Sequence, residues 1–357
     1  MRKKRVGIIT WHYYPNFGSC LQSYGLQCLV KELGYKPQII NYRNKKYGNV
    51  NALKLKIRYY FRFLFKHRDP FLEFHYKYLF QTKLVQDEGK LKFFSRKFYA
   101  VICGSDQIWA PNVLNSIYLL SFVEGGKKKI AYAASIGLNY IPIELDDVYK
   151  ILLTRFYRIS LREESGALLL YRKYEINANV VLDPTFILHA EHWRRLEIRA
   201  NNCPQKFVFV YFLNSNNNYK ESVVHCVKSF DDEIEIVGIS ANNLNAQWMK
   251  QLTGIGPREF LWLIDNAEAV ITDSYHGTIF SLLFHKIFLT IKRFDDDSPI
   301  CQNSRIYQLN KYFSLEKNIC EINRPMEFNR EFDYQEFEKR LKVLRKKSID
   351  FLREALE

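Results

Sequence analysis

The sequence predicts an α/β fold of two Rossmann-like, doubly wound domains, with a cleft between them and a C-terminal helix. The length, 357 residues, suits two domains of ordinary size. Short β-branched strands alternate with amphipathic helices, which is typical of parallel sheets. Polar residues follow several strands, at the edge where open α/β sheets bind ligands. We expect domains at residues 1–195 and 196–332, followed by a helix at 333–357.

Composition excludes several classes of protein. Hydrophobic residues make up 47% of the chain, enough for packed cores, and no run of eighteen apolar residues predicts a transmembrane helix. The apolar part of the N-terminus, Val6–Thr10, is too short for a signal peptide, so we expect a cytoplasmic protein. The 7 Cys include no CxxC pair, which argues against disulfides and structural zinc, and we expect no metal site.

The formal charge of +15 is concentrated in one segment. Asn41–Ala100 holds 15 Lys and Arg against 4 Asp and Glu, interleaved with aromatic residues, and we interpret residues 43–97 as a helical insertion. Within it, Leu53–Phe71 fits a basic helix on an anionic membrane surface, a nucleic-acid contact, or a solvated face over a packed stripe. No nucleic-acid-binding motif supports the second alternative, so we expect no nucleic-acid partner.

The first domain opens with a strand, a helix and a second strand. The expected elements are strands at Lys4–Thr10, Gln38–Tyr42, Tyr99–Cys103, Ile130–Ala134, Arg158–Leu161 and Val180–Leu182, with helices at Ser19–Leu33 and Leu145–Arg155. The first turn lacks GxGxxG, so no dinucleotide fingerprint is present. Asn16, Gly18 and Ser19 lie in that turn, and Ser105 and Asp106 follow the third strand. These residues are candidates for a ligand-binding edge, although a tight turn explains the first group equally well.

The second domain is predicted to repeat the alternation. Its expected elements are strands at Phe207–Leu213, Glu235–Ile239, Ala269–Thr272 and Ile287–Ile291, helices at Tyr219–Phe230 and Pro257–Ala267, and the terminal helix Asp333–Leu356.

The stretch Ala269–Arg293 is the main candidate for a functional site. Asp273 and Ser274 are helix-capping residue types that follow a strand, so His276, Gly277 and Thr278 fall in the first helical turn. A helix N-terminus favours anions. Lys292 and Arg293 end the next strand at the same edge, so we expect them to converge with His276 on one ligand. A capping role for His276 and a solvated Lys–Arg pair remain the structural alternative.

Six segments in order resemble the polysaccharide pyruvyl transferase family. They are NFGSCLQSYGLQ (16–27), ICGSDQIW (102–109), AYAASIG (131–137), SLREESG (160–166), VLDPTF (181–186) and ITDSYHGTIFSLL (271–283). The resemblance implies a GT-B-like fold and transfer of the pyruvyl group of phosphoenolpyruvate to two sugar hydroxyls, giving a cyclic ketal and phosphate. It places the family's donor-binding arginine at Arg162, its histidine at His276 and its lysine at Lys292.

The implied chemistry suits these residue types. Arg162 can clamp a carboxylate or phosphate, Lys292 adds a point charge, and His276 can transfer a proton or bind the leaving phosphate. Asp106 and Asp273 are candidates to orient or deprotonate the sugar. The donor is a substrate, and no cofactor is expected.

The resemblance implies an acceptor in a bacterial capsule, exopolysaccharide or cell-wall polymer, or its lipid-linked precursor. Such an acceptor fits a cytoplasmic enzyme with peripheral contact to the inner membrane face through Leu53–Phe71. Two alternatives stay open: a GT-B glycosyltransferase that uses a nucleotide sugar, and a non-catalytic binding protein of the same fold. The sequence does not predict the oligomeric state.

Overall fold

The computed structural model describes residues 3–44, 69–213, 219–240, 247–321 and 324–357, which form two compact units. Unit 1 comprises Met1–Leu188 and Val343–Glu357, and unit 2 comprises His189–Lys342. The boundary therefore precedes the expected junction at residue 195. The reason is that Trp193 is buried and packs against Phe280 of unit 2, with 5.2 Å between ring centroids. Most of the basic segment Leu53–Phe71 lies outside the described residues.

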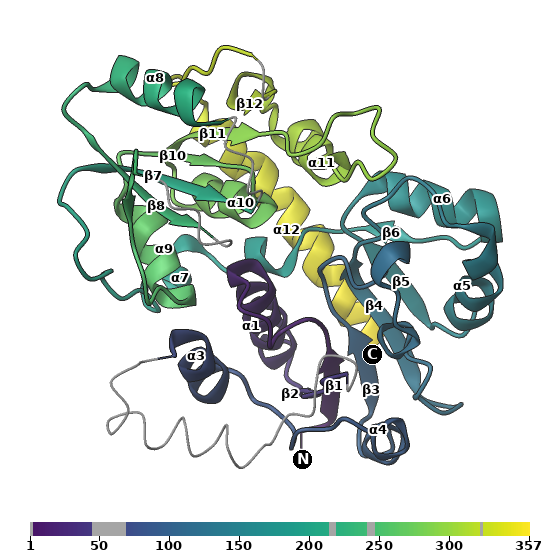
Figure 1. Cartoon of the computed structure of the whole chain (residues 1–357). Coiled ribbons are helices and arrows are strands. Elements are labelled where there is room, and N and C mark those ends of the chain that lie inside the picture. Colours follow the sequence, from purple (N-terminus) through teal and green to yellow (C-terminus); the bar gives the residue numbers. More distant parts are fainter. Residues whose placement is uncertain (1–2, 45–68, 214–218, 241–246, 322–323) are drawn as a thin grey trace. The chain divides into compact units, whose positions relative to one another are not determined.

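Unit 1 is built on a six-stranded parallel sheet (Figure 1). The strands are β1 (Arg5–Ile9), β2 (Lys36–Ile39), β3 (Ala100–Cys103), β4 (Lys128–Ala134), β5 (Arg158–Leu161) and β6 (Asn179–Val180), in the order β2-β1-β3-β4-β5-β6. The helices are α1 (Phe17–Glu32), α3 (Pro70–Tyr78), α4 (Glu88–Ser95), α5 (Asp146–Leu153) and α6 (Glu164–Tyr174), with 3-10 turns at Pro111–Val113, Ser116–Leu119, Ile143–Leu145 and Pro184–Phe186.

Both faces of this sheet are covered. On one face, Val101 and Ala131 join a buried cluster that includes Trp109 and Tyr149 of the connecting segments. On the other face, Tyr132 of β4 lies 6.3 Å from Phe351 of α12 (Tyr334–Leu356), measured between ring centroids. Strands buried on both sides explain why the sequence shows continuous apolar runs here rather than alternation.

Unit 2 repeats this plan with a second six-stranded parallel sheet. Its strands are β7 (Phe207–Phe212), β8 (Glu235–Ser240), β9 (Lys250–Gln251), β10 (Ala269–Thr272), β11 (Ile287–Ile291) and β12 (Ile319–Cys320), in the order β12-β11-β10-β7-β8-β9. Its helices are α7 (Ala190–Arg194), α8 (Lys220–Phe230), α9 (Pro257–Asn266), α10 (Tyr275–Leu283) and α11 (Ser304–Phe313), with a 3-10 turn at Glu316–Asn318.

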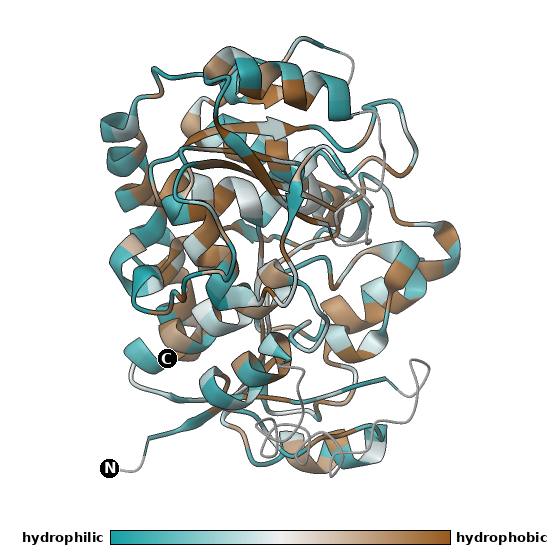
Figure 2. Ribbon diagram, turned by 60° about the vertical axis from the view of Figure 1, so that its left-hand side comes forward, coloured by the Kyte–Doolittle hydropathy of each residue, from teal (hydrophilic) through white to brown (hydrophobic). Residues whose placement is uncertain are grey.

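Successive residues of β7 face opposite layers of helices. Val208 and Val210 pack with Val223 and Val227 of α8, whereas Tyr211 lies 5.1 Å from Phe260 of α9, measured between ring centroids. Figure 1 shows α8 on one side of these strands and α9 and α10 on the other, and Figure 2 shows hydrophobic residues along the strands between them. The predicted doubly wound α/β architecture is confirmed in each unit.

Three further features complete the description of the fold. The helix α12 starts in unit 2 and ends in unit 1, so it is not the separate element that the sequence analysis expected. Among the described residues, no helix is both long and apolar enough to span a bilayer. All seven cysteines carry free thiols, and six of them are buried.

Candidate functional site

In unit 1, a polar network lies at the carboxyl edge of the sheet. Ser105 and Asp106 follow β3, Arg162 follows β5, and Asp183 follows β6 by three residues. The carboxyl ends of parallel strands meet at one edge, so five of the six sequence motifs contribute side chains or backbone to the same place.

Arg162 is the centre of this network and is completely buried. Its Nη1 donates to Oδ2 of Asp183 at 3.1 Å, its Nη2 lies 3.6 Å from Oδ1 of Asp106, and its Nε lies 3.9 Å from Oε2 of Glu163. Asp183 and Glu163 are buried as well. One guanidinium is therefore surrounded by three carboxylates, each of which also accepts bonds from the fold.

These carboxylates are held in fixed positions. Asp183 accepts from the hydroxyl of Ser105 at 2.7 Å and from the hydroxyl of Thr185 at 2.7 Å. Glu163 Oε1 accepts from the backbone N–H groups of Ile136 and Gly137, at 2.9 and 3.2 Å. Burial and the nearby charge of Asp183 raise the pKa of the Tyr132 phenol. The edge is thus a rigid arrangement of acids rather than an open cationic pocket.

Asp106 is buried, but it is the least buried of the three acids around Arg162. Its Oδ2 accepts from the hydroxyl of Ser19 at 2.6 Å, and its Oδ1 accepts from the backbone N–H of Gln107 at 2.9 Å. Its φ is +83°, a left-handed conformation that costs energy in a residue other than glycine. Such a conformation occurs where the surrounding structure holds a side chain in place, often at a functional site.

The other predicted residues of unit 1 support the fold instead of facing a ligand. Asn16 is the N-cap of α1 and accepts from the N–H of Ser19 at 3.0 Å. Gly18 is buried inside the same helix. Ser105 is buried and bonded to Asp183. Asn16 therefore has a capping role, and its expected ligand contact stays a prediction.

In unit 2, the corresponding edge is formed by the start of α10 and the end of β11. Ser274 is the N-cap of α10, and its hydroxyl accepts from the N–H of Gly277 at 3.3 Å. Asp273 does not cap the helix. Its carboxylate accepts from the N–H of Leu213 at 2.7 Å and lies 3.5 Å from Nε of Arg293. Arg293 also donates to the carbonyl of Asp273 at 3.0 Å.

His276 lies in the first turn of α10 and is buried. Its ring meets the ring of Tyr275 edge to face at 5.3 Å between centroids. The guanidinium of Arg305, from α11, lies 5.7 Å from the centre of the Tyr275 ring. Sequence reasoning missed Tyr275 and Arg305. Tyr275 lies in a motif that the sequence analysis quoted, whereas Arg305 follows an irregular segment that carries no motif.

Gly277 and Thr278 are predicted site residues whose roles are structural. A Cβ at Gly277 would meet Oγ1 of Thr272 at 2.6 Å, so only glycine lets α10 begin this close to the end of β10. Thr278 is buried, and its hydroxyl lies 2.8 Å from the hydroxyl of Thr290 on β11. Both residues fix the start of α10, and so the position of His276.

Lys292 turns away from the group around Arg293. Its Nζ lies 2.8 Å from Asp296, 3.0 Å from Glu321 and 3.0 Å from the hydroxyl of Tyr307. Burial acts to lower the pKa of Lys292, but its hydrogen bonds to these three groups raise the pKa above its usual value. Burial likewise acts to raise the pKa of Asp296, and its hydrogen bonds, the first of them from Lys292, lower it to about 2. The two residues therefore have different partners, and their expected convergence with His276 on one ligand stays a prediction.

The two edges bury opposite members of their ion pairs. In unit 1 the Arg162 side chain is 0% exposed, and its partner Asp106 is 11% exposed. In unit 2 the Asp273 side chain is 0% exposed, and its partner Arg293 is 21% exposed. Unit 1 therefore presents a carboxylate at its edge, whereas unit 2 presents a guanidinium beside a helix N-terminus, which carries a partial positive charge.

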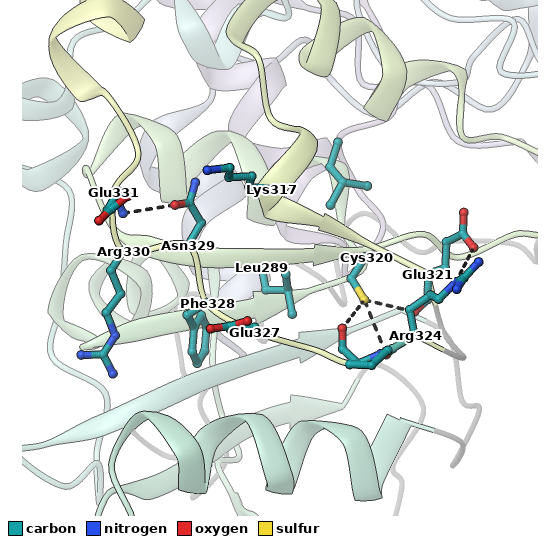
Figure 3. A pocket seen from close by; sticks show the side chains of 12 residues that line it. Leu289, Lys317, Cys320, Glu321, Arg324, Glu327, Phe328, Asn329, Arg330 and Glu331 are labelled. Carbon is teal, nitrogen blue, oxygen red and sulfur yellow. Dashed lines mark hydrogen bonds and ion pairs between the residues drawn. The ribbon is translucent and has the colours of Figure 1, made fainter.

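A separate pocket of about 770 Å³ lies beside β12 in unit 2 (Figure 3). Its lining includes Lys317, Glu321, Arg324, Glu327 and Arg330, a mixture of both charges. None of the predicted site residues lines it. No group of three potential metal-binding side chains occurs in the described ranges.

Comparison with known proteins decides the family. A family model described as polysaccharide pyruvyl transferase matches residues 16–293, which include all of the edge residues described above except Arg305, Asp296, Tyr307 and Glu321. The chain belongs to the polysaccharide pyruvyl transferase family. This membership makes it a transferase of polysaccharide biosynthesis, and the family implies a sugar or polysaccharide acceptor. No curated protein sequence matches the chain.

Solved structures show the fold of this pyruvyl transferase family member. Arabidopsis thaliana UGT89C1 matches with a TM-score of 0.54 and 9% identity, covering 99% of this chain and 100% of that one. UDP-GlcNAc 2-epimerase from Neisseria meningitidis, bound to UDP-GlcNAc, matches with a TM-score of 0.51 and 10% identity, covering 98% and 99%. Such neighbours are GT-B glycosyltransferases and epimerases, and the GT-B-like fold is confirmed. The cleft expected between the domains stays a prediction.

Proposed function

We propose that this transferase moves the pyruvyl group of phosphoenolpyruvate onto two hydroxyls of a sugar. A proton adds to the terminal enol carbon, and one sugar oxygen bonds to the neighbouring carbon. The second sugar oxygen then replaces phosphate on that carbon, which closes a cyclic ketal. Of the two hydroxyl protons, one is retained in the new methyl group in the net balance, and the other leaves with phosphate.

The observation that carries this proposal is the partly exposed side chain of Arg293, whose guanidinium lies beside the start of α10. Phosphoenolpyruvate has a carboxylate and a phosphate. A guanidinium can bind either group through two parallel hydrogen bonds, and a helix N-terminus favours negative charge. Asp273 fixes the Arg293 side chain from the buried side, so little conformational entropy is lost when a ligand binds.

His276 is the proposed proton-transfer group or phosphate ligand. Imidazole changes its protonation state near neutral pH, which suits both the protonation of the enol carbon and the departure of phosphate. Tyr275 and the N-cap Ser274 hold the first turn of α10 on which His276 lies. Lys292 stays a predicted donor-binding residue by family resemblance, although its charge is balanced by Asp296 and Glu321.

Asp106 is the residue proposed to act on the acceptor sugar. Its carboxylate is the least buried of the three acids around Arg162 and is held by Ser19, so it can orient a sugar hydroxyl or take its proton. The acceptor is proposed to be a sugar of a cell-surface polysaccharide or of its lipid-linked precursor. A lipid-linked acceptor would lie at the membrane. The basic segment Leu53–Phe71 is therefore proposed to bind an anionic membrane surface.

Two experiments test these assignments. Phosphate release from phosphoenolpyruvate across a panel of sugar acceptors, with mass spectrometry of the products, should reveal a pyruvyl ketal. A product that has gained a hexose from a nucleotide sugar would support the glycosyltransferase alternative instead. Co-sedimentation with anionic liposomes should be stronger for the wild type than for a variant with the Lys and Arg of Leu53–Phe71 changed to Gln, and equal binding would remove the membrane proposal.

A further inference from the structure

Arg43 is a partly buried cation of unit 1 that has no acid beside it. It follows β2, and its guanidinium carbon lies 5.0 Å from the centre of the Tyr13 ring. No ion pair joins it to an acid in the described ranges, and the residues outside those ranges include neither Asp nor Glu. Its Nε is buried without a hydrogen-bond partner in the described part of the chain. By contrast, Arg96 of the same unit binds Glu124 through two nitrogens.

An unpaired charge of this kind is costly to the fold. A cation that leaves water without a counter-ion loses hydration that nothing replaces. The Tyr13 ring offsets part of this cost, because an aromatic face attracts a cation. Burial lowers the pKa of Arg43, but a guanidinium stays charged at neutral pH. The folded chain therefore holds a positive charge that its own acids do not neutralise.

The two histidines near Arg43 are neutral and do not share this charge. Burial, with the charge of Arg43 as a smaller cause, lowers the pKa of His12 to about 4. Burial, with the charges of His12 and Arg43, lowers that of His75 to about 3. At neutral pH, the positive charge in this cluster of described residues belongs to Arg43 alone. An anion that approaches the cluster would meet one guanidinium.

Arg43 lies at the same edge of the unit 1 sheet as Asp106. Ile8 of β1 pairs with Ile39 of β2, and Arg43 comes four residues after Ile39, beyond the carboxyl end of the strand. In the sheet, β1 separates β2 from β3, which Asp106 follows. Neighbouring strands lie about 4.8 Å apart, so the ends of β2 and β3 are about 10 Å apart. A sugar and a phosphate ester that it carries span a similar length.

We infer that Arg43 binds the phosphate of an acceptor whose sugar carries a phosphate or diphosphate ester at its anomeric oxygen. The inference rests on the proposed function, because it names the class of acceptor that the unit 1 edge takes. A guanidinium stacked on an aromatic ring keeps its N–H groups in one plane, where two phosphate oxygens can accept them. A lipid-linked precursor carries such an ester, whereas a neutral polysaccharide does not.

The first test uses inorganic diphosphate as the probe, with the whole chain and no acceptor. Diphosphate should slow hydrogen–deuterium exchange in wild-type peptides covering residues 41–44. Arg43→Gln should lose this protection, and Arg43→Lys should keep part of it, because lysine retains the charge. The control is Arg158→Gln, since Arg158 has an exposed side chain at the start of β5, at the opposite edge of the sheet. No protection in the wild type, or equal protection in Arg43→Gln, would overturn the inference.

The second test compares two forms of one acceptor. The sugar found by the phosphate-release screen is supplied as its anomeric phosphate and as its methyl glycoside. Arg43→Gln should raise the KM for the phosphate form by about 10–100-fold with kcat unchanged, through loss of a charge-assisted contact. The KM for the methyl glycoside should change much less. Equal changes for the two forms would contradict a contact with the phosphate.

Stability measurements on the same variants exclude a purely structural role. Arg43→Gln removes a charge that no acid neutralises, so its unfolding temperature should stay close to that of the wild type. A lower unfolding temperature together with intact diphosphate protection would make Arg43 a residue of the fold alone and would overturn the inference.

Further outcomes separate the sources of the phosphate. Weaker calorimetric binding of phosphoenolpyruvate by Arg43→Gln would make the anion the donor, and weaker co-sedimentation with anionic liposomes would make it a lipid head group. Either result would overturn the assignment to the acceptor. If the wild type releases no phosphate from phosphoenolpyruvate with any acceptor, the proposed function fails. The diphosphate measurement would then still decide whether Arg43 binds a phosphate group.

Discussion

The two sheet edges of this protein are built alike but differ in the charge that they expose. Each edge has an arginine paired with an aspartate at the carboxyl ends of parallel strands. In unit 1 Arg162 is the more deeply buried member and the Asp106 side chain is 11% exposed, whereas in unit 2 Asp273 is the more deeply buried member and the Arg293 side chain is 21% exposed. We propose that the more deeply buried member of each pair fixes the other member, and that the other member faces the ligand.

We propose that the two units take different ligands. An exposed carboxylate suits a neutral hydroxyl that has to lose a proton, and an exposed guanidinium beside a helix N-terminus suits an anion. A transfer from an anionic donor to a neutral sugar requires both. The contrast between the two sheet edges is therefore a better basis for the proposed pyruvyl transfer than the number of cationic residues near the site.

The largest effect is expected at His276. His276→Gln should lower phosphate release by about 10²–10⁴-fold if the imidazole transfers a proton. The matched control is His285→Gln, because His285 is partly exposed in the same unit and pairs with Glu338. Steady-state phosphate release with a working acceptor provides the measurement. Equal losses in both variants would mean that the assay responds to stability rather than to the site.

Asp106→Asn tests the unit 1 side of the comparison. Asparagine tolerates the left-handed backbone of this position, so the fold should persist. We expect kcat to fall by about 10²-fold and the affinity for phosphoenolpyruvate to stay unchanged, because the carboxylate acts on the acceptor. Asp147→Asn, on the exposed surface of α5, is the control. A kcat close to that of the wild type would remove Asp106 from the mechanism.

Arg293→Gln tests the unit 2 side. Loss of a charge-assisted contact should weaken phosphoenolpyruvate binding by about 10–100-fold, and the wild-type affinity should fall as salt is added. Arg324→Gln, at the pocket beside β12, is the control because that guanidinium is mostly exposed. Calorimetry at two salt concentrations gives both results. A stronger effect from Arg324→Gln would move the donor to the pocket of Figure 3.

A smaller effect concerns the acid stability of unit 1. Burial and the nearby charge of Arg43 lower the pKa of His12 to about 4, and burial and the charge of His12 lower that of His75 to about 3. Both values lie below the ordinary pKa of about 6.5, so the unfolded chain takes up protons first as the pH falls. The contribution of these two neutral histidines to the free energy of unfolding is therefore complete above pH 6.5 and is lost progressively as the pH falls below that value.

Unfolding measured between pH 6.5 and pH 5 should show a loss of about 2 kcal/mol for each of these histidines. A folded His75→Gln variant should lose part of this pH dependence. His225→Gln in α8 of unit 2 should retain it in full. Identical pH profiles for the two variants would show that the buried histidines do not control acid stability.

The strands and helices could be predicted because their signals are local. Ser274 was recognised as a capping type, and the structure makes it the N-cap of α10. The boundary between the two units lies a few residues before the expected junction at residue 195, where Trp193 packs against Phe280, a residue distant in the sequence. Local patterns do not reveal such a contact.

The site was only partly predictable for the same reason. The burial of Arg162 depends on Asp106 and Asp183, which approach it only in the folded sheet. Lys292 and Arg293 follow the end of β11, and their partners, among them Glu321 and Asp273, are distant in the sequence. The position of Arg305 could not be predicted from the sequence, because its approach to Tyr275 depends on the path of the irregular segment before α11.

The most direct measurement of the central claim is hydrogen–deuterium exchange with and without phosphoenolpyruvate. The account predicts that the donor slows exchange in peptides covering residues 273–278 and 292–293 of unit 2. Peptides covering residues 104–107 of unit 1 should be unchanged by the donor alone. Protection at residues 104–107 with none at residues 273–278 would place the donor at Asp106 and contradict the account.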